Sequence, residues 1–153
     1  MENDEIFMRE ALSLARIAAD MGEIPVGAVV VRDGEIVGRG YNLRETELRA
    51  TAHAEVLAIE QACEAVGSWR LSGCTLYVTL EPCPMCAGAI VNSRIDRVVF
   101  GCRDALAGAC GSVINLGAYP FNHSFVLESG VLAEESAALL GEFFKEKRKK
   151  KNI

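Results

Sequence analysis

Two short segments of the sequence carry residue types that bind metals and move protons. His53 and Glu55 are separated by one residue, and Cys83 and Cys86 lie three positions apart. Two thiols at this spacing on the first turn of a helix face the same way, and the partial positive charge of the helix end favours the thiolate form. Two thiolates and one imidazole leave a fourth coordination position open, as in catalytic zinc sites. We therefore predict one Zn²⁺ per chain, held by His53, Cys83 and Cys86.

Glu55 is predicted to be the catalytic acid and base. Zinc lowers the pKa of a bound water molecule to about 7, so that a carboxylate beside it can take a proton and later return it to a leaving group. The combination of His-x-Glu with a later Pro-Cys-x-x-Cys is a specific signal, whereas a Cys-x-x-Cys pair alone is a weak one. The pattern indicates a hydrolytic enzyme.

A closed, structural zinc site is the alternative for these ligands. It would need a fourth protein ligand, and the candidates are Cys63, Cys74, Cys102, Cys110 and His123. None of the candidates belongs to a paired motif, and a cysteine on an apolar face is usually a small buried hydrophobic residue. The open, catalytic arrangement is favoured.

Periodicity and turn residues predict the elements that position these groups. Helices are expected over residues 5–21, with Asn3 or Asp4 as the N-cap, over 52–66, over 84–93 and from about 133. Strands are expected over residues 26–31, 35–40, 75–79, 98–100 and 124–127, the first two joined by an Asp33-Gly34 turn. The Gly-rich stretch 101–123 has the length of a functional loop. This order predicts an α/β fold with a mixed central sheet and a site beyond the strand ends.

Composition and length narrow the class of protein. The chain has 153 residues, half of them hydrophobic, which fits a single domain over residues 1–153. No segment approaches the roughly 18 apolar residues of a membrane span, and the acidic N-terminus is unlike a secretory signal. The expected location is the cytoplasm, where six cysteines indicate thiols or metal ligands rather than disulfides.

The charge is distributed unevenly along the chain. The net charge is −5, yet every lysine follows Phe144, and residues 145–151 contain six basic residues and one acidic residue. A basic tail (145–153) on an acidic body is either the solvated end of a helix or an electrostatic contact for phosphates. Taken alone, the composition of this tail favours the solvated helix end.

The motifs resemble those of the zinc nucleobase deaminases and, more closely, of the bacterial tRNA adenosine deaminases in the cytidine/deoxycytidylate deaminase superfamily. The resemblance spans about residues 5–148. The segments that carry it are 24–29, 51–55, 75–89, 103–105, 121–123, 130–135 and 143–144. The fold it implies is a cytidine deaminase-like three-layer α/β/α sandwich with about five strands, and the assembly it implies is a homodimer.

The resemblance also implies a reaction: hydrolytic deamination of the wobble adenosine (position 34) to inosine in a tRNA anticodon stem-loop, with the tRNA-Arg that carries an ACG anticodon as the expected substrate. It assigns substrate contacts residue by residue. Val26 would form a wall of the base pocket, Ala54 would offer its backbone N–H, and Phe144 would lie on the RNA side. Asn42 would contact the target nucleoside, and Asp104 would contact the backbone of the flipped nucleotide. Asn122 would contact the anticodon loop.

Plain structural roles are the alternative for several of these residues. Without the resemblance, Asn42, Asp104 and Asn122 are turn residues, and of Phe143 and Phe144 at least one is expected in the core. The chain also departs from the family at Arg49-Ala50, where Asp-Pro or a close variant is usual. This change concerns the loop that enters the His53 helix and leaves the ligands in place.

Two other functions compete with the tRNA interpretation. A metabolite deaminase acting on free guanine, cytosine or a nucleoside would use the same zinc chemistry. This function would not explain why the last helix resembles that of the tRNA adenosine deaminases or why it ends in a basic tail. A zinc-stabilised RNA-binding module without catalysis is disfavoured because it gives Glu55 no task.

Overall fold

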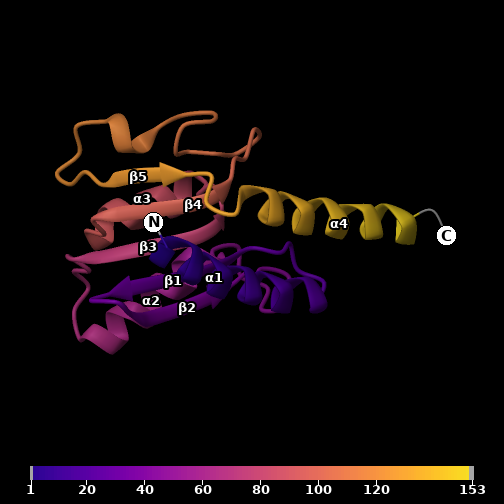
Figure 1. Cartoon of the computed structure of the whole chain (residues 1–153), viewed down its shortest axis with the longest axis horizontal. Coiled ribbons are helices and arrows are strands. Elements are labelled where there is room, and N and C mark those ends of the chain that lie inside the picture. Colours follow the sequence, from indigo (N-terminus) through magenta and orange to yellow (C-terminus); the bar gives the residue numbers. More distant parts are fainter. Residues whose placement is uncertain (1, 152–153) are drawn as a thin grey trace.

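A mixed five-stranded sheet forms the centre of the computed structural model, which describes residues 2–151 (Figure 1). The sheet order is β2-β1-β3-β4-β5, with β1 antiparallel to both of its neighbours and β3, β4 and β5 parallel to one another. The elements in chain order are α1 (Glu2–Asp20), β1 (Gly27–Arg32), β2 (Glu35–Tyr41), α2 (Ala54–Val66), β3 (Cys74–Leu80), α3 (Pro84–Ser93), β4 (Arg97–Cys102), a short 3₁₀ helix (Leu116–Ala118), β5 (Val126–Ser129) and α4 (Ala133–Lys151). The predicted α/β fold class is confirmed.

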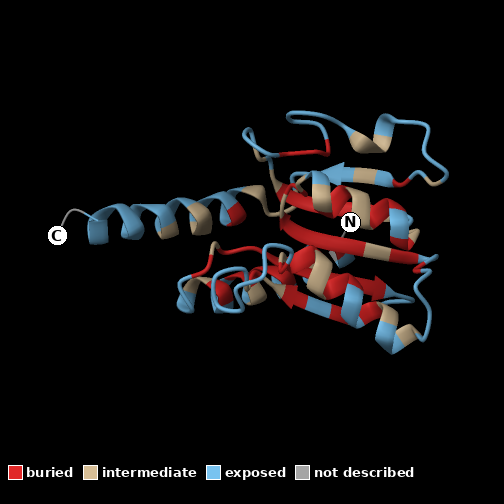
Figure 2. Cartoon of the chain, turned by 180° about the vertical axis from the view of Figure 1, so that it is seen from behind, coloured by how far each residue is buried: buried red, intermediate tan, exposed pale blue. Residues whose placement is uncertain are grey.

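Helices cover both faces of the sheet. Helix α1 lies on the face towards the viewer in Figure 1, and α2 and α3 lie on the opposite face, towards the viewer in Figure 2. The core beneath α1 is small and includes Met8, Val29 and Tyr77. The larger core lies beneath α2 and α3, which share it with the inner face of all five strands. The three-layer arrangement follows from strands with apolar residues on both faces.

Helix α2 packs directly on the backbone of β2 because two glycines face it. A Cβ atom at Gly40 would lie 2.2 Å from the carbonyl oxygen of Ala54, and one at Gly38 would lie 2.2 Å from that of Ala58. Any side chain at Gly40 would therefore push away the first turn of α2, which carries Glu55 and follows His53.

The topology brings several chain ends to one edge of the sheet. The carboxyl ends of β2, β3 and β4 meet there with the amino end of β1, and α2 and α3 begin beside them. The functional site is predicted at this edge.

Several predicted boundaries differ from the structure by one to three residues, and for two of them the structure shows the reason. Helix α1 begins at Glu2 rather than residue 5, and neither Asn3 nor Asp4 is its cap. Instead the buried Asp4 carboxylate accepts hydrogen bonds from the Arg97 guanidinium (2.7 Å) and the Tyr77 hydroxyl (2.8 Å). Strand β5 begins two residues later than predicted, after Phe125 has entered the core.

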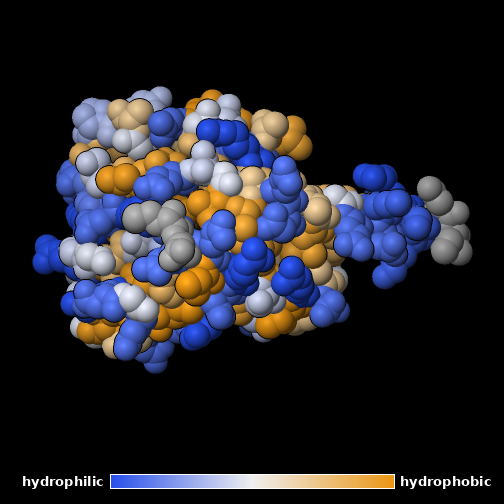
Figure 3. All heavy atoms as spheres, viewed as in Figure 1, coloured by the Kyte–Doolittle hydropathy of each residue, from blue (hydrophilic) through white to orange (hydrophobic). Residues whose placement is uncertain are grey.

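Helix α4 projects from the body of the protein at the same edge of the sheet (Figure 1). Beyond its first turn it is mostly exposed (Figure 2), and its distal half is hydrophilic (Figure 3). Phe143 is half-buried and Phe144 is 40% exposed, so the prediction that one of them belongs to the core is wrong. The last two residues of the basic tail, 152 and 153, lie outside the described residues. Within residues 2–151, no helix has both the length and the apolar character needed to cross a membrane.

Candidate metal and substrate site

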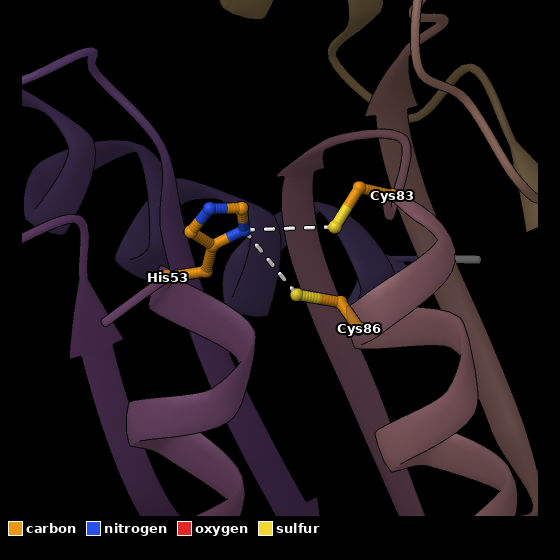
Figure 4. A group of neighbouring side chains, drawn as sticks. All are labelled: His53, Cys83 and Cys86. Atoms are coloured by element: carbon orange, nitrogen blue, oxygen red, sulfur yellow. Dashed lines mark hydrogen bonds between the residues drawn. The ribbon is translucent and has the colours of Figure 1, made fainter. Parts of the chain in front are cut away.

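The three predicted ligands converge from the N-termini of two neighbouring helices (Figure 4). His53 is the N-cap of α2, Cys83 is the N-cap of α3, and Cys86 lies in the first turn of α3, where Pro84 begins the helix. The Nδ1 atom of His53 lies 3.6 Å from the Sγ atom of each cysteine. Among residues 2–151 this is the group of ligand atoms close enough to hold one metal ion, all within 4.8 Å of one another.

The spacing of these atoms fits zinc. With Zn–N near 2.05 Å and Zn–S near 2.3 Å, tetrahedral angles place the nitrogen and sulfur ligands about 3.6 Å apart. The measured distances from Nδ1 to both sulfurs agree with this value. The donor set, two sulfurs and one imidazole, is that of a zinc site with an open position.

The electrostatics of the three side chains favour a bound cation. Hydrogen bonding with Cys86 lowers the pKa of Cys83 to about 4, while the same contact raises the pKa of the buried Cys86 thiol. Hydrogen bonding with Cys83 raises the pKa of His53. The three ligand groups share protons through these contacts. A divalent cation bound between them would take the place of the shared protons. The positive ends of two helix dipoles support the thiolates.

Glu55 lies in the first turn of α2, beside the ligands but not among them. It is 4% exposed and lines the same pocket as His53 and Cys83. Burial raises the pKa of Glu55 to about 7. A carboxyl group that titrates near neutrality can both accept and return a proton, as general acid–base catalysis requires.

A pocket of about 560 Å³ opens beside the ligands at this edge of the sheet. His53, Glu55 and Cys83 contribute to its lining. Of the six predicted substrate contacts, the structure brings five to this pocket and leaves Asn122 outside the lining. The five are Val26, Asn42, Ala54, Asp104 and Phe144. Their contacts with a substrate stay predictions.

Asn42 and Asp104 also stabilise the chain locally. The Asn42 amide donates to the Ile24 carbonyl (3.3 Å) and accepts from the Arg44 N–H (3.2 Å). One carboxylate oxygen of Asp104 accepts from the N–H groups of Leu106 and Ala107. Both side chains therefore make turns and line the pocket, so that the two roles predicted for them are compatible.

Comparison with known proteins identifies the family. The model of the MafB19-like deaminase family matches residues 2–148. The chain is 55% identical to the tRNA-specific adenosine deaminase of Bacillus subtilis (strain 168), over 99% of this chain and 94% of that protein. The chain belongs to the tRNA-specific adenosine deaminases. It shares 49% identity with the family member of Haemophilus influenzae, over 99% and 89% of the two chains.

Solved structures agree with this assignment. A structure from studies of A-to-I editing by tRNA:A34 deaminases has a TM-score of 0.85 and 44% identity, covering 87% of this chain and 97% of that one. A guanine deaminase from Nitrosomonas europaea has the same fold at lower similarity, with a TM-score of 0.76 and 26% identity over 91% and 83% of the two chains. Membership of the tRNA-specific adenosine deaminases accounts for the His/Cys/Cys group as a zinc-type site of the family.

Sequence reasoning missed further residues of the pocket. Arg44, Arg103 and Leu106 line it from loops, and Leu140 reaches it from α4. The most important omission is Glu81, a buried carboxylate in the pocket lining directly before the Pro82-Cys83 turn. Burial alone would raise its pKa, but hydrogen bonds from the segment after β4 outweigh burial and keep the pKa below its usual value. The sequence feature that could have indicated Glu81 is its place as an acidic residue at the end of a buried strand.

The unusual Arg49-Ala50 pair lies in the loop before α2. Arg49 forms an ion pair with Glu47 (2.9 Å), with both side chains partly exposed, and it does not line the pocket. The loop is held instead by the buried Glu23 carboxylate, which accepts from the N–H groups of Glu45 (3.1 Å) and Thr46 (2.6 Å). The ligand His53 is therefore positioned without the residues that the family usually has here.

Proposed function

We propose that the protein hydrolytically deaminates the wobble adenosine, position 34, in a tRNA anticodon stem-loop to give inosine. One observation carries the proposal: the buried Glu55 carboxyl group lies beside a zinc-type ligand set at the base of a pocket large enough for a nucleoside. The tRNA-specific adenosine deaminases to which the chain is 49–55% identical support the choice of substrate.

The chain's own residues account for the proton transfers. Zinc held by His53, Cys83 and Cys86 would supply Lewis acidity that makes a water molecule acidic near neutral pH. Glu55 accepts a proton from the water whose oxygen attacks C6 of the adenine. It delivers this proton to N1, then takes the proton of the new C6 hydroxyl and passes it to the amine, so that the C6–N6 bond breaks, C6=O forms and ammonia leaves. The adenosine must be turned out of its stack, which costs little in an unpaired loop.

Three finer features belong to the same proposal. We propose one zinc ion per chain, a tRNA-Arg with the ACG anticodon as a substrate, and a homodimer. The irregular segment after β4 supports the homodimer, because it leaves large apolar side chains in water that a second copy could cover. These are Leu106, Val113, Ile114, Tyr119 and Phe121. Sedimentation of the purified protein tests this feature, and a monomer at micromolar concentration contradicts it.

A substrate panel separates this function from that of a metabolite deaminase. Release of ammonia is measured with an ACG anticodon stem-loop, free guanine, free cytosine, adenosine and cytidine, each at equal concentration. We expect ammonia from the stem-loop alone. Release from guanine or cytosine with none from the stem-loop would establish the metabolite function instead.

Asp104→Asn is expected to lower the preference for RNA over DNA. This substitution preserves the local turn, because the side-chain oxygen of Asn can still accept from the N–H groups of Leu106 and Ala107. The other carboxylate oxygen is replaced by an uncharged NH₂ group, which donates a hydrogen bond and does not accept one. A carboxylate at the target nucleotide can accept from the ribose 2′-hydroxyl, which DNA lacks. Single-turnover rates on matched RNA and DNA hairpins measure the preference. A rate ratio within about twofold of wild type would leave Asp104 as a turn residue only.

The basic end of α4 is expected to contact phosphates. Replacing Lys147, Lys149, Lys150 and Lys151 with Gln should weaken stem-loop binding and reduce the log–log salt slope by roughly 0.7–0.9 for each phosphate that is no longer neutralised. These residues lie on the exposed, projecting half of α4 (Figure 3), beyond Phe144 at the pocket. Binding is measured by fluorescence anisotropy over a range of salt concentrations.

Arg32→Gln is the matched control for the tail, because this exposed residue lies at the end of β1 farthest from the pocket edge. The log–log salt slope of stem-loop binding by Arg32→Gln should equal that of wild type. An unchanged slope in the lysine variant would show that the tail is a solvated helix end.

A further inference from the structure

Glu81 is a buried carboxylate that no step of the proposed reaction uses. It follows β3, is 2% exposed and accepts four hydrogen bonds from one segment. Its Oε1 atom accepts from the Asp104 N–H (3.1 Å) and from the Ser112 hydroxyl, and its Oε2 atom accepts from the N–H groups of Cys110 and Ser112 (3.0 Å each).

The hydrogen bonds to Glu81 hold the segment 103–112 in place of the backbone hydrogen bonds that a helix or strand would provide. The segment contains no helix and no strand of the sheet, and its first five residues, 103–107, all line the pocket. One backbone bond to the turn before α3 reinforces it, from the Ala109 N–H to the Pro82 carbonyl (2.8 Å). A single side chain therefore binds both ends of the loop, at Asp104 and at Ser112.

Gly108 shows how closely the loop is wrapped around this carboxylate. A Cβ atom there would lie 2.4 Å from Cδ and Oε2 of Glu81 and 2.5 Å from the Asp104 carbonyl oxygen. Because real Cβ atoms do not approach other heavy atoms this closely, Gly108 is required for the contact. The loop and the carboxylate form a complementary pair.

We propose that Glu81 is a positioning residue for substrate binding. Its carboxylate holds the loop 103–112 so that Asp104 and its neighbours form one wall of the pocket. With four donors on its two oxygens, Glu81 acts through this loop rather than on the reacting atoms. The metal ligands and Glu55 are held by α2 and α3, so the loop affects binding more than chemistry. The inference rests on the proposed function only for the identity of the substrate.

Glu81→Gln tests the inference at a single group. The Gln amide has only one acceptor oxygen in place of the two carboxylate oxygens. When this oxygen faces the N–H groups of Cys110 and Ser112, the Gln NH₂ group faces the Asp104 N–H, which is then left without an acceptor. We expect KM to rise about tenfold, kcat to stay within about threefold, and zinc content to be unchanged. Hydrogen exchange at the Asp104 amide should become faster.

Gly108→Ala perturbs the same contact from the opposite side and should raise KM in the same direction. Asp4→Asn is the matched control for a buried carboxylate outside the pocket, and Gly141→Ala controls for the added methyl group at a position with nothing within 4 Å. Asp4→Asn should be less stable than wild type, because Arg97 loses its buried charged partner, and should show no change in KM. Gly141→Ala should match wild type in KM and kcat.

Two results would overturn the inference. One is a KM within twofold of wild type in both Glu81→Gln and Gly108→Ala. The other is a fall in kcat and zinc content at constant KM, which would make Glu81 a support for Cys83. The ratio of variant to wild-type KM is measured on whichever substrate the wild type deaminates. A failure of the tRNA assignment is seen in the wild type alone and is thereby distinguished from a failure of the inference.

Discussion

Glu55→Ala is expected to lower the single-turnover rate of deamination by about 10⁴-fold while the protein keeps its zinc and its fold. General acid–base catalysis by one side chain contributes roughly 10²–10⁴-fold, and the proposed cycle uses Glu55 first as base and then as acid. Glu55 does not belong to the group of side chains that could hold a metal ion, so the proposed ligands His53, Cys83 and Cys86 are unchanged in this variant. Glu55→Gln, which keeps the shape without the charge, should lose as much activity.

The stability of these variants provides a second readout. Burial raises the pKa of Glu55, so the fold gains nothing from a charge at this position. We expect the free energy of unfolding of Glu55→Gln to equal or exceed that of wild type. Glu60→Gln, an exposed change on the same helix, is the control and should leave the rate unchanged. A Glu55→Ala protein with a tenth of wild-type turnover would contradict the role given to Glu55.

Cys86→Ala is expected to remove both zinc and activity. The wild type should contain about one zinc ion per chain, and the variant well under half of that after dialysis against a chelator. The loss of activity should exceed the roughly 10–100-fold that follows when a residue hydrogen-bonded to a metal ligand is replaced. Elemental analysis and the stem-loop assay measure the two quantities on the same preparation.

Cys74→Ala is the matched control for this change. Cys74 is buried like Cys86 but begins β3 at the end of the sheet away from the pocket. It should retain zinc and activity. Active wild-type protein free of metal would contradict the metal assignment, and so would a zinc-replete, active Cys86→Ala variant.

Features governed by local sequence could be predicted. The Asp33-Gly34 turn adopts positive φ at both residues, as its hairpin requires, and Gly67 ends α2 in the left-handed conformation. The metal ligands were predictable for the same reason. Each of them is tied to the N-terminus of a helix whose start is encoded nearby. Because β1 is antiparallel to both β2 and β3, the strands β2 and β3 run in the same direction and bring those helices to one edge.

Features governed by distant partners could not be predicted. Asp4 has the sequence position of a helix cap, and only the fold brings Arg97, 93 residues away, to bind it. Glu81 has the position of a turn residue, and only the fold wraps the loop after β4 around it. At least one of Phe143 and Phe144 was expected in the core, but the sequence pattern cannot show that α4 leaves the body of the protein. In each case the deciding neighbour is set by tertiary structure and not by spacing along the chain.

Mapping of inosine in a reacted tRNA shows directly whether the protein deaminates the wobble adenosine. An unmodified tRNA-Arg transcript with the ACG anticodon is incubated with the zinc-loaded protein in H₂¹⁸O, digested and analysed by mass spectrometry. We expect inosine at position 34 alone, with one ¹⁸O atom in its base, and none with Glu55→Ala. Adenosine left intact at position 34 by the zinc-loaded wild type, or inosine spread over the other loop adenosines, would contradict the proposed function.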